Sequence, residues 1–153
     1  MLDQFAQRLV GTGGGFAVQS SSCTISHSGE VPAAFVTLKP GARLAPDALL
    51  GEVAAHVYER PAVPKRVVVL DALPLTAVGK VYKPALRLRA TELKLQEVLS
   101  AAVPGIGLKV AASEKGAGCV AEVGVDAARD PQMEQRLRKA LGAIAVETVF
   151  RFG

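Results

Sequence analysis

A strand, a short loop and a helix follow one another between residues 66 and 102, and this order constrains the fold most. The β-branched run Arg66–Leu70 predicts a buried strand. The loop that follows holds Pro74 and closes with Gly79, which lets the backbone turn tightly. Pro84 suits the first turn of a helix, and leucines at helical spacing carry that helix to about Ala102. The pattern predicts an α+β fold in which helices cover a small sheet.

Further elements are predicted on both sides of this pattern. An Asp-Pro pair at 130–131 predicts a helix start, and Gly142 predicts its end. The order strand, strand, helix, strand in the last third predicts a small sandwich with helices on one face. In full, we predict strands at 31–38, 66–70, 108–112, 119–125 and 146–152, and helices at 46–60, 84–102 and 131–141.

Composition excludes several classes of protein. The 153 residues suffice for one ordinary domain or two small ones, and without Trp the core must be built from Ala, Val and Leu. No apolar run approaches the ~20 residues that span a bilayer. The N-terminus lacks the pattern of a signal peptide, so we expect a cytoplasmic protein without a membrane span. The pI of 9.3 fits phosphate-bearing ligands. It is the sole support for a nucleic-acid binder, and we expect no nucleic-acid partner.

The cysteines and histidines form no metal-binding motif. Cys23 and Cys119 are too few for a disulfide framework or a structural zinc site. His27 and His56 are far apart in the sequence. We therefore predict no metal site in this chain.

Residues 1–28 have an atypical composition for the start of a domain. A short helix is predicted over Leu2–Val10, because its apolar residues share one face. The glycine cluster Gly11–Gly15 and the serines Ser20–Ser22 predict a flexible linker. The glycines lack the Lys-Ser/Thr of a phosphate-binding loop and have no preceding strand, so they predict no nucleotide site.

Three motifs carry a resemblance to a known family. They are the stretches Gly29–Gly41, Val63–Arg66 and Leu73–Lys80. In this order they resemble the C-terminal domain of the AMP-forming acyl-CoA synthetases, which belong to the adenylate-forming superfamily. The resemblance covers residues from about 29 to 90. It implies a ligase of fatty acid or other acid metabolism that converts a carboxylic acid, ATP and coenzyme A into acyl-CoA, AMP and pyrophosphate.

The resemblance also implies roles for individual residues. By position, Lys80 would be the catalytic lysine, which bridges the carboxylate and the α-phosphate in the first step. Gly79, Lys83 and Arg87 would be the cofactor-binding residues, and Gly79 would also shape the turn. Lys83 and Arg87 would hold phosphate or the partner domain, and the alternative is that they lie in a solvated first turn of the helix. ATP with Mg²⁺ and coenzyme A would serve the complete enzyme, and none is expected to bind this chain tightly. The large N-terminal adenylation domain, which would bind ATP and the acid, is absent, so we expect the isolated chain to be inactive.

The predicted organisation has three parts. Residues 1–28 are the atypical N-terminal segment, 29–92 the domain that resembles the AMP-binding enzymes, and 93–153 an α+β extension. Two alternatives remain for the extension, because its elements could pack on the sheet or form a homodimer surface. A non-catalytic ligand-binding or dimerisation module is therefore the alternative function. The sequence does not identify the acid, and fatty and aromatic acids are both candidates.

Overall fold

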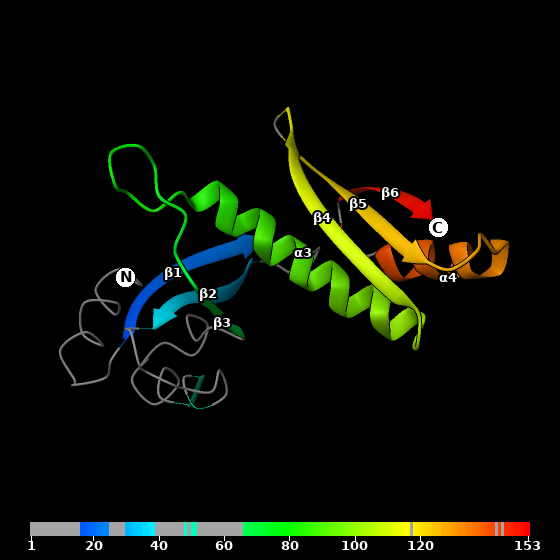
Figure 1. The fold of residues 1–153 in the computed structure, drawn as a ribbon, viewed down its shortest axis with the longest axis horizontal. Helices are drawn as coiled ribbons and strands as arrows, with labels where there is room; N and C mark the ends of the chain where they lie inside the picture. Colours follow the sequence, from blue (N-terminus) through cyan, green and yellow to red (C-terminus); the bar gives the residue numbers. More distant parts are fainter. Residues whose placement is uncertain are drawn as a thin grey trace. The chain divides into compact units, whose positions relative to one another are not determined.

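The computed structural model describes residues 16–24, 30–38, 48, 50–51, 66–116, 118–142, 144 and 146–153. Its elements confirm the α+β class, with two small sheets and helices in the described ranges (Figure 1). The chain divides into two compact units, and the change from one to the other falls between Arg87 and Leu88. The helix α3 (Lys83–Ala102) contributes its first residues to the first unit and the remainder to the second.

The first unit contains a three-stranded sheet in the order β1-β2-β3. Strand β1 (Phe16–Thr24) is antiparallel to β2 (Glu30–Leu38), and β2 is parallel to β3 (Arg66–Leu70). The predicted strands 31–38 and 66–70 are therefore confirmed. Apolar side chains of β2 and β3 are buried, namely Ala34, Phe35, Val36 and Val67.

The prediction of a flexible linker was wrong at Ser20–Ser22, because these serines lie in strand β1. The three serines Ser20–Ser22 pair in register with Pro32, Ala33 and Ala34 of β2, although serine has little intrinsic preference for strands. Pairing with a neighbouring strand decides the conformation there. The glycine cluster and the predicted helix over Leu2–Val10 lie outside the described residues.

The helix predicted over 46–60 can be compared at only a few positions. Ala48, Leu50 and Gly51 are helical, and the rest of that range lies outside the described residues. The following loop and helix agree with prediction, since α3 begins one residue before Pro84 and ends at Ala102.

The second unit is built from α3 and four further elements. They are β4 (Gly107–Lys115), β5 (Gly118–Asp126), α4 (Pro131–Leu141) and β6 (Glu147–Phe152). Strand β5 lies in the middle of the sheet, antiparallel to β4 and parallel to β6. In Figure 1, α4 lies next to the end of β5, and it connects β5 to β6 along the chain. The predicted order of strand, strand, helix and strand is confirmed.

One core holds this unit together. Alternate residues of β5 (Ala121, Val123 and Val125) are fully or almost fully buried, as expected for a strand with one covered face. They share a cluster with side chains of both helices, so α3 and α4 cover the same face of the sheet. The helical members are Leu95, Leu99, Met133, Leu137 and Leu141.

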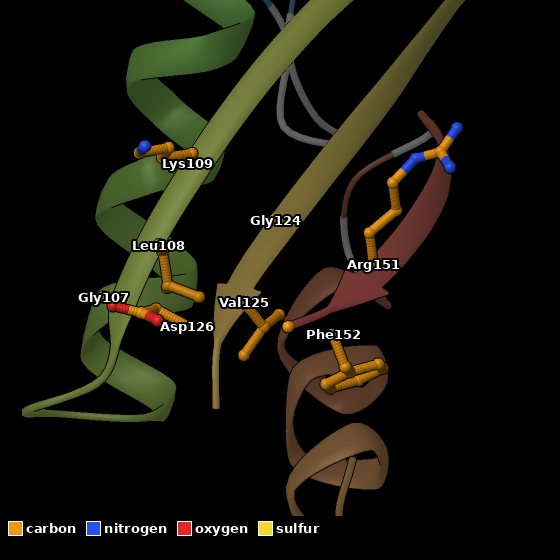
Figure 2. Close-up of a pocket in the computed structure, with 9 residues that line it drawn as sticks. Gly107, Leu108, Lys109, Gly124, Val125, Asp126, Arg151 and Phe152 are labelled. Carbon is orange, nitrogen blue, oxygen red and sulfur yellow. The ribbon is translucent and has the colours of Figure 1, made fainter. Parts of the chain in front are cut away.

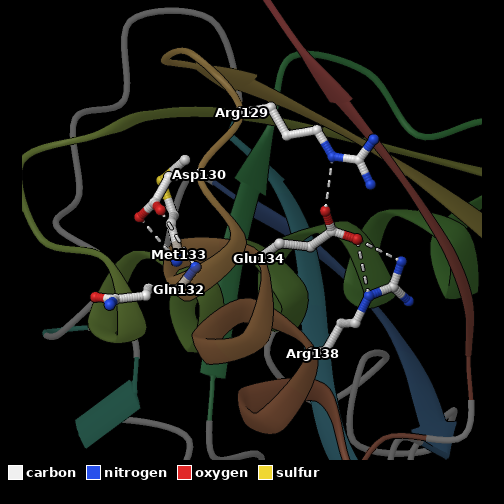
Figure 3. A network of polar contacts seen from close by, with 6 residues as sticks. All are labelled: Arg129, Asp130, Gln132, Met133, Glu134 and Arg138. Carbon is white, nitrogen blue, oxygen red and sulfur yellow. Dashed lines mark hydrogen bonds and ion pairs between the residues drawn. The ribbon is translucent and has the colours of Figure 1, made fainter.

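The ends of α4 follow from local chemistry. The Asp130 carboxylate accepts hydrogen bonds from the backbone N–H groups of Gln132 at 3.3 Å and Met133 at 3.1 Å, which caps the helix (Figure 3). Gly142 follows the last helical residue. In the first turn, Glu134 accepts hydrogen bonds from Arg138 and Arg129, and these bonds hold the pKa of its carboxyl below the ordinary 4.5. None of the helices described here is both long and apolar enough to cross a membrane.

Candidate functional site

A tight hairpin-like turn joins β3 to α3 and carries the predicted site. Gly79 adopts a φ of 75°, a left-handed conformation that residues with a side chain rarely adopt. Its backbone N–H donates a hydrogen bond to the Thr76 carbonyl at 2.9 Å. The Thr76 N–H donates to the Lys80 carbonyl at 2.7 Å. A second layer closes the base of the turn, where the Tyr82 N–H donates to the Pro74 carbonyl at 2.8 Å. The lysine therefore stands on a defined bend between two short extended arms.

A side chain adds to this bend. The Thr76 hydroxyl accepts a hydrogen bond from the backbone N–H of Lys80 at 3.2 Å. Thr76 thus contacts the lysine backbone through both its hydroxyl and its N–H. This arrangement fixes the backbone of Lys80 and leaves the long side chain to move, which suits a cation that enters and leaves a partner's surface.

The predicted cations all lie on the surface. Lys80 is exposed, and its side chain forms no hydrogen bond or ion pair with the residues that the structure describes. Lys83 and Arg87 are exposed on the first two turns of α3. Their spacing of four places them on one face of that helix. The structure therefore brings Lys83 and Arg87 together, and it holds Gly79 and Lys80 at the tip of the adjoining turn.

Sequence reasoning missed the apolar side chains of the same loop. Leu75, Val78 and Tyr82 have exposed fractions of 60%, 79% and 41%. They are three of the four large apolar side chains that are exposed in the described part of the chain. A cluster of this kind around a cation is typical of a surface that another protein or domain covers. The available signal was the presence of three large apolar residues in a loop bounded by prolines, outside any predicted element.

A separate cleft of about 460 Å³ lies at one end of the second unit's sheet (Figure 2). Gly107 and Gly124 lack side chains and leave it open, while Lys109, Asp126 and Arg151 line it. Figure 2 shows the side chains of Lys109 and Arg151 pointing in opposite directions. Its lining carries both signs of charge, so the cleft defines no class of ligand.

The thiol of Cys119, in the second unit, is not activated for nucleophilic catalysis. Burial, and then the nearby charge of Glu92, raise the pKa of the Cys119 thiol above its ordinary 9.0. The thiol is therefore protonated near neutral pH and is a weak nucleophile. Across the ranges that the structure describes, no three side chains of His, Cys, Asp or Glu are grouped so that they could hold a metal ion.

These features define a class: a small α+β domain that presents one lysine and an apolar surface on a tight turn. Residues 20–80 match the family described as the AMP-binding enzyme C-terminal domain. This segment is therefore similar to the C-terminal domain of adenylate-forming enzymes. The match begins within β1 and ends at Lys80.

Individual proteins are similar to this chain in sequence or in fold. A marinolic acid–CoA ligase of Pseudoalteromonas sp. (strain SANK 73390) is 36% identical over 62 residues, which are 40% of this chain and 10% of that ligase. The ATP-bound structure of MatB from Rhodopseudomonas palustris is similar in fold, with a TM-score of 0.51 and 22% identity. That similarity covers 60% of this chain and 18% of MatB. An ATP-bound chimera of MatB gives the same TM-score and identity. The chain thus spans less than a fifth of these relatives.

Proposed function

We propose that this chain supplies the lysine-bearing domain of an AMP-forming acyl-CoA synthetase, with Lys80 as the catalytic residue of the adenylation step. The observation that carries the proposal is the exposed lysine on a turn fixed by hydrogen bonds and surrounded by exposed apolar side chains. The family match over residues 20–80 includes this turn and ends at the lysine. A cation of this kind acts only where another domain presents the reacting groups.

The chemistry assigns Lys80 to the first of two steps. The carboxylate oxygen of the acid attacks the α-phosphorus of ATP, and pyrophosphate leaves. Negative charge gathers between the carboxylate and the phosphate oxygens, and an ammonium between them stabilises that charge and aligns the attack. In the second step the sulfur of coenzyme A attacks the acyl carbonyl, loses its proton, and AMP leaves. This step does not need the lysine.

The neighbouring residues have supporting roles in this proposal. Gly79 and Thr76 fix the backbone from which Lys80 extends. Leu75, Val78 and Tyr82 would lose their exposure to water against the large domain, which favours docking. Lys83 and Arg87 would contact phosphate groups or acidic side chains of that domain.

ATP, coenzyme A and Mg²⁺ would reach this site only together with a large domain. An exposed turn cannot enclose a nucleotide, since binding sites for small molecules are concave. The described residues also offer no group of carboxylates for a metal ion. The ligands of Mg²⁺ would therefore lie elsewhere, and selectivity for the acid would lie with the large domain.

The test joins this chain to the large domain of an adenylate-forming enzyme, such as that of MatB, in place of its own C-terminal domain. We expect Lys80→Ala to slow pyrophosphate release by about 10²–10³-fold. Thioester formation from preformed acyl-adenylate and coenzyme A should continue at an unchanged rate. Lys139→Ala, which removes an exposed lysine of α4, is the matched control and should alter neither step. Equal rates of adenylation with and without the Lys80 side chain would refute the role of this lysine.

A further inference from the structure

The sheet of the second unit has two outer strands whose free edges differ. At the β4 edge, the backbone N–H of Ala112 donates to Glu92 Oε1 at 3.0 Å. Gln96 Nε2 donates to the Leu108 carbonyl at 3.1 Å. Side chains of α3 therefore occupy backbone groups that an additional strand would need. Such coverage is a common way in which proteins block pairing at a sheet edge.

The β6 edge is open in the part of the chain that the structure describes, because β5 is the only strand paired with β6 there. The Gly153 N–H donates to the Val125 carbonyl at 3.2 Å, so Gly153 directs its backbone toward β5. Backbone groups of successive residues point to opposite sides of a strand. Hence Thr148 and Phe150 direct their N–H and C=O groups outward, where a further strand can pair with them.

The side chains on the exposed face of β6 are complementary to themselves. Glu147, Val149 and Arg151 alternate along this face, and all are exposed. Val149 has an exposed fraction of 45%, which is high for a large apolar residue. If two copies of β6 pair antiparallel about Val149, the two valines face each other. Each Glu147 then faces Arg151 of the other copy, and a shift by two residues in either direction loses both ion pairs.

We propose that this chain forms a two-fold dimer through antiparallel pairing of β6 with β6 of a second copy, centred on Val149. The two sheets would then continue into one another. The interface between the two β6 strands, which we call the seam, would bury the exposed Val149 side chains. It would also place unlike charges opposite each other, which favours cross-strand pairing.

Charges already present beside the seam support this arrangement. Glu147 accepts from Lys115 Nζ at 2.7 Å, and Arg151 pairs with Glu122. All four side chains are at least half exposed, so these pairs contribute little alone and leave the charges free to interact further. Across the seam they would form an alternating row: Lys115, Glu147, then Arg151 and Glu122 of the second copy.

The oligomeric state of the full chain tests the proposal directly. Light scattering after size exclusion should give a mass near twice 15.9 kDa at high protein concentration and a fall toward 15.9 kDa on dilution. E147R places two cations at each seam pair, and R151E places two anions there. We expect each single change to raise the dissociation constant of the dimer by about tenfold or more. Lys109→Glu, a charge reversal on β4, is the matched control and should keep the wild-type mass.

Mixing E147R with R151E distinguishes a dimer formed through β6 from a dimer formed through any other surface. In a mixed pair, unlike charges meet at both seam positions, so E147R and R151E together should recover the dimer that each has lost. The intrachain partners Lys115 and Glu122 cannot produce this recovery. Circular dichroism establishes that each variant is folded. If a charge variant fails to fold, Val149→Lys replaces it, because it sets two cations face to face at the two-fold axis and should yield monomers.

A wild-type mass of 15.9 kDa at every concentration would overturn the proposal. A dimer that survives E147R, R151E and Val149→Lys would do so too, as would a mixture that stays monomeric.

Discussion

Gly79 determines how Lys80 is presented. With a φ of 75° it occupies the left-handed region, which glycine enters without the steric penalty of a side chain. A Cβ at this position would have no atom within 4 Å, so the space around it is open. Any stability lost when Gly79 is replaced by a residue with a side chain therefore comes from backbone strain and not from a steric clash.

We predict that Gly79→Ala lowers the free energy of unfolding by about 1 kcal/mol, because alanine is strained in this conformation. The same change should slow adenylation in the joined enzyme described above, since a relaxed turn would displace Lys80. Urea unfolding and pyrophosphate release measure the two effects. Gly124→Ala is the control, because its new Cβ would meet Lys109 Cβ at an ordinary 3.7 Å and its φ is not in the left-handed region. A Gly79→Ala chain as stable and as active as wild type would contradict this account.

The sequence identified the residues at the turn but not its surroundings. Lys80 and Gly79 could be predicted because a glycine-lysine pair between a strand and a helix forms part of a recognisable motif. The exposure of Leu75, Val78 and Tyr82 could not, because an apolar residue in a loop is as often tucked under it as left in water. Their role in docking, like that of Lys83 and Arg87, stays a prediction.

At the scale of single elements, helix α4 has a carboxylate, that of Glu134, which two arginine side chains contact. Arg138 donates to Glu134 Oε1 through Nη2 at 2.8 Å, and Arg129 Nε donates to Oε2 at 2.9 Å (Figure 3). A negative group in the first helical turn also interacts favourably with the helix dipole. The ionised form of Glu134 is therefore favoured in the folded chain.

This preference has a defined sign in the pH dependence of stability. A carboxyl whose pKa is lower when folded stabilises the fold above the unfolded value of 4.5, and the contribution is lost as the pH falls through the folded pKa. We predict that wild type loses stability on acidification through this range and that Glu134→Gln loses less. NMR titration of the Glu134 carboxyl and urea unfolding at several pH values measure both quantities.

Arg138→Gln provides the matched comparison, since it removes the strongest of the hydrogen bonds that lower this pKa. The Glu134 carboxyl of that variant should titrate closer to its ordinary value. Titration of Glu134 at 4.5 in the wild-type chain would contradict the prediction.

Elements with clear periodicity were predicted well, and those defined by pairing were not. The alternation of β5 and the spacing of Met133, Leu137 and Leu141 reflect one buried face each, so the sequence alone locates them. Strand β1 contains a run of serines and follows a glycine cluster, and both favour a loop. Pairing with β2 makes that segment a strand, and no local pattern within β1 specifies this pairing.

At the scale of the whole molecule, the second unit has a core of its own. Its apolar cluster draws on α3, β5 and α4, and all of its members lie between residues 95 and 141. The carboxylate of Glu92 also belongs to this unit through its bond to the Ala112 N–H. The division of the chain into 1–28, 29–92 and 93–153 stays a proposal, and the position of Glu92 makes the last boundary testable.

We predict that residues 83–153 fold alone, because this range keeps α3 intact. Residues 93–153 should be less stable by at least about 1 kcal/mol, since they lose the Glu92 contact with a partly buried N–H group. Dispersed amide signals in NMR spectra and thermal unfolding distinguish the two fragments. An unfolded 83–153 fragment, or equal stability of the two, would show that the boundary lies elsewhere.

The aromatic content of the chain has a practical consequence. The sequence contains no Trp and two tyrosines, and one of these, Tyr82, is 41% exposed two positions after Lys80. Ultraviolet emission from the isolated chain is thus dominated by its two tyrosines, because it has no tryptophan and the five phenylalanines emit only weakly. A tryptophan-free partner that covers this turn would change the intensity of that emission, so association can be followed optically in unlabelled protein.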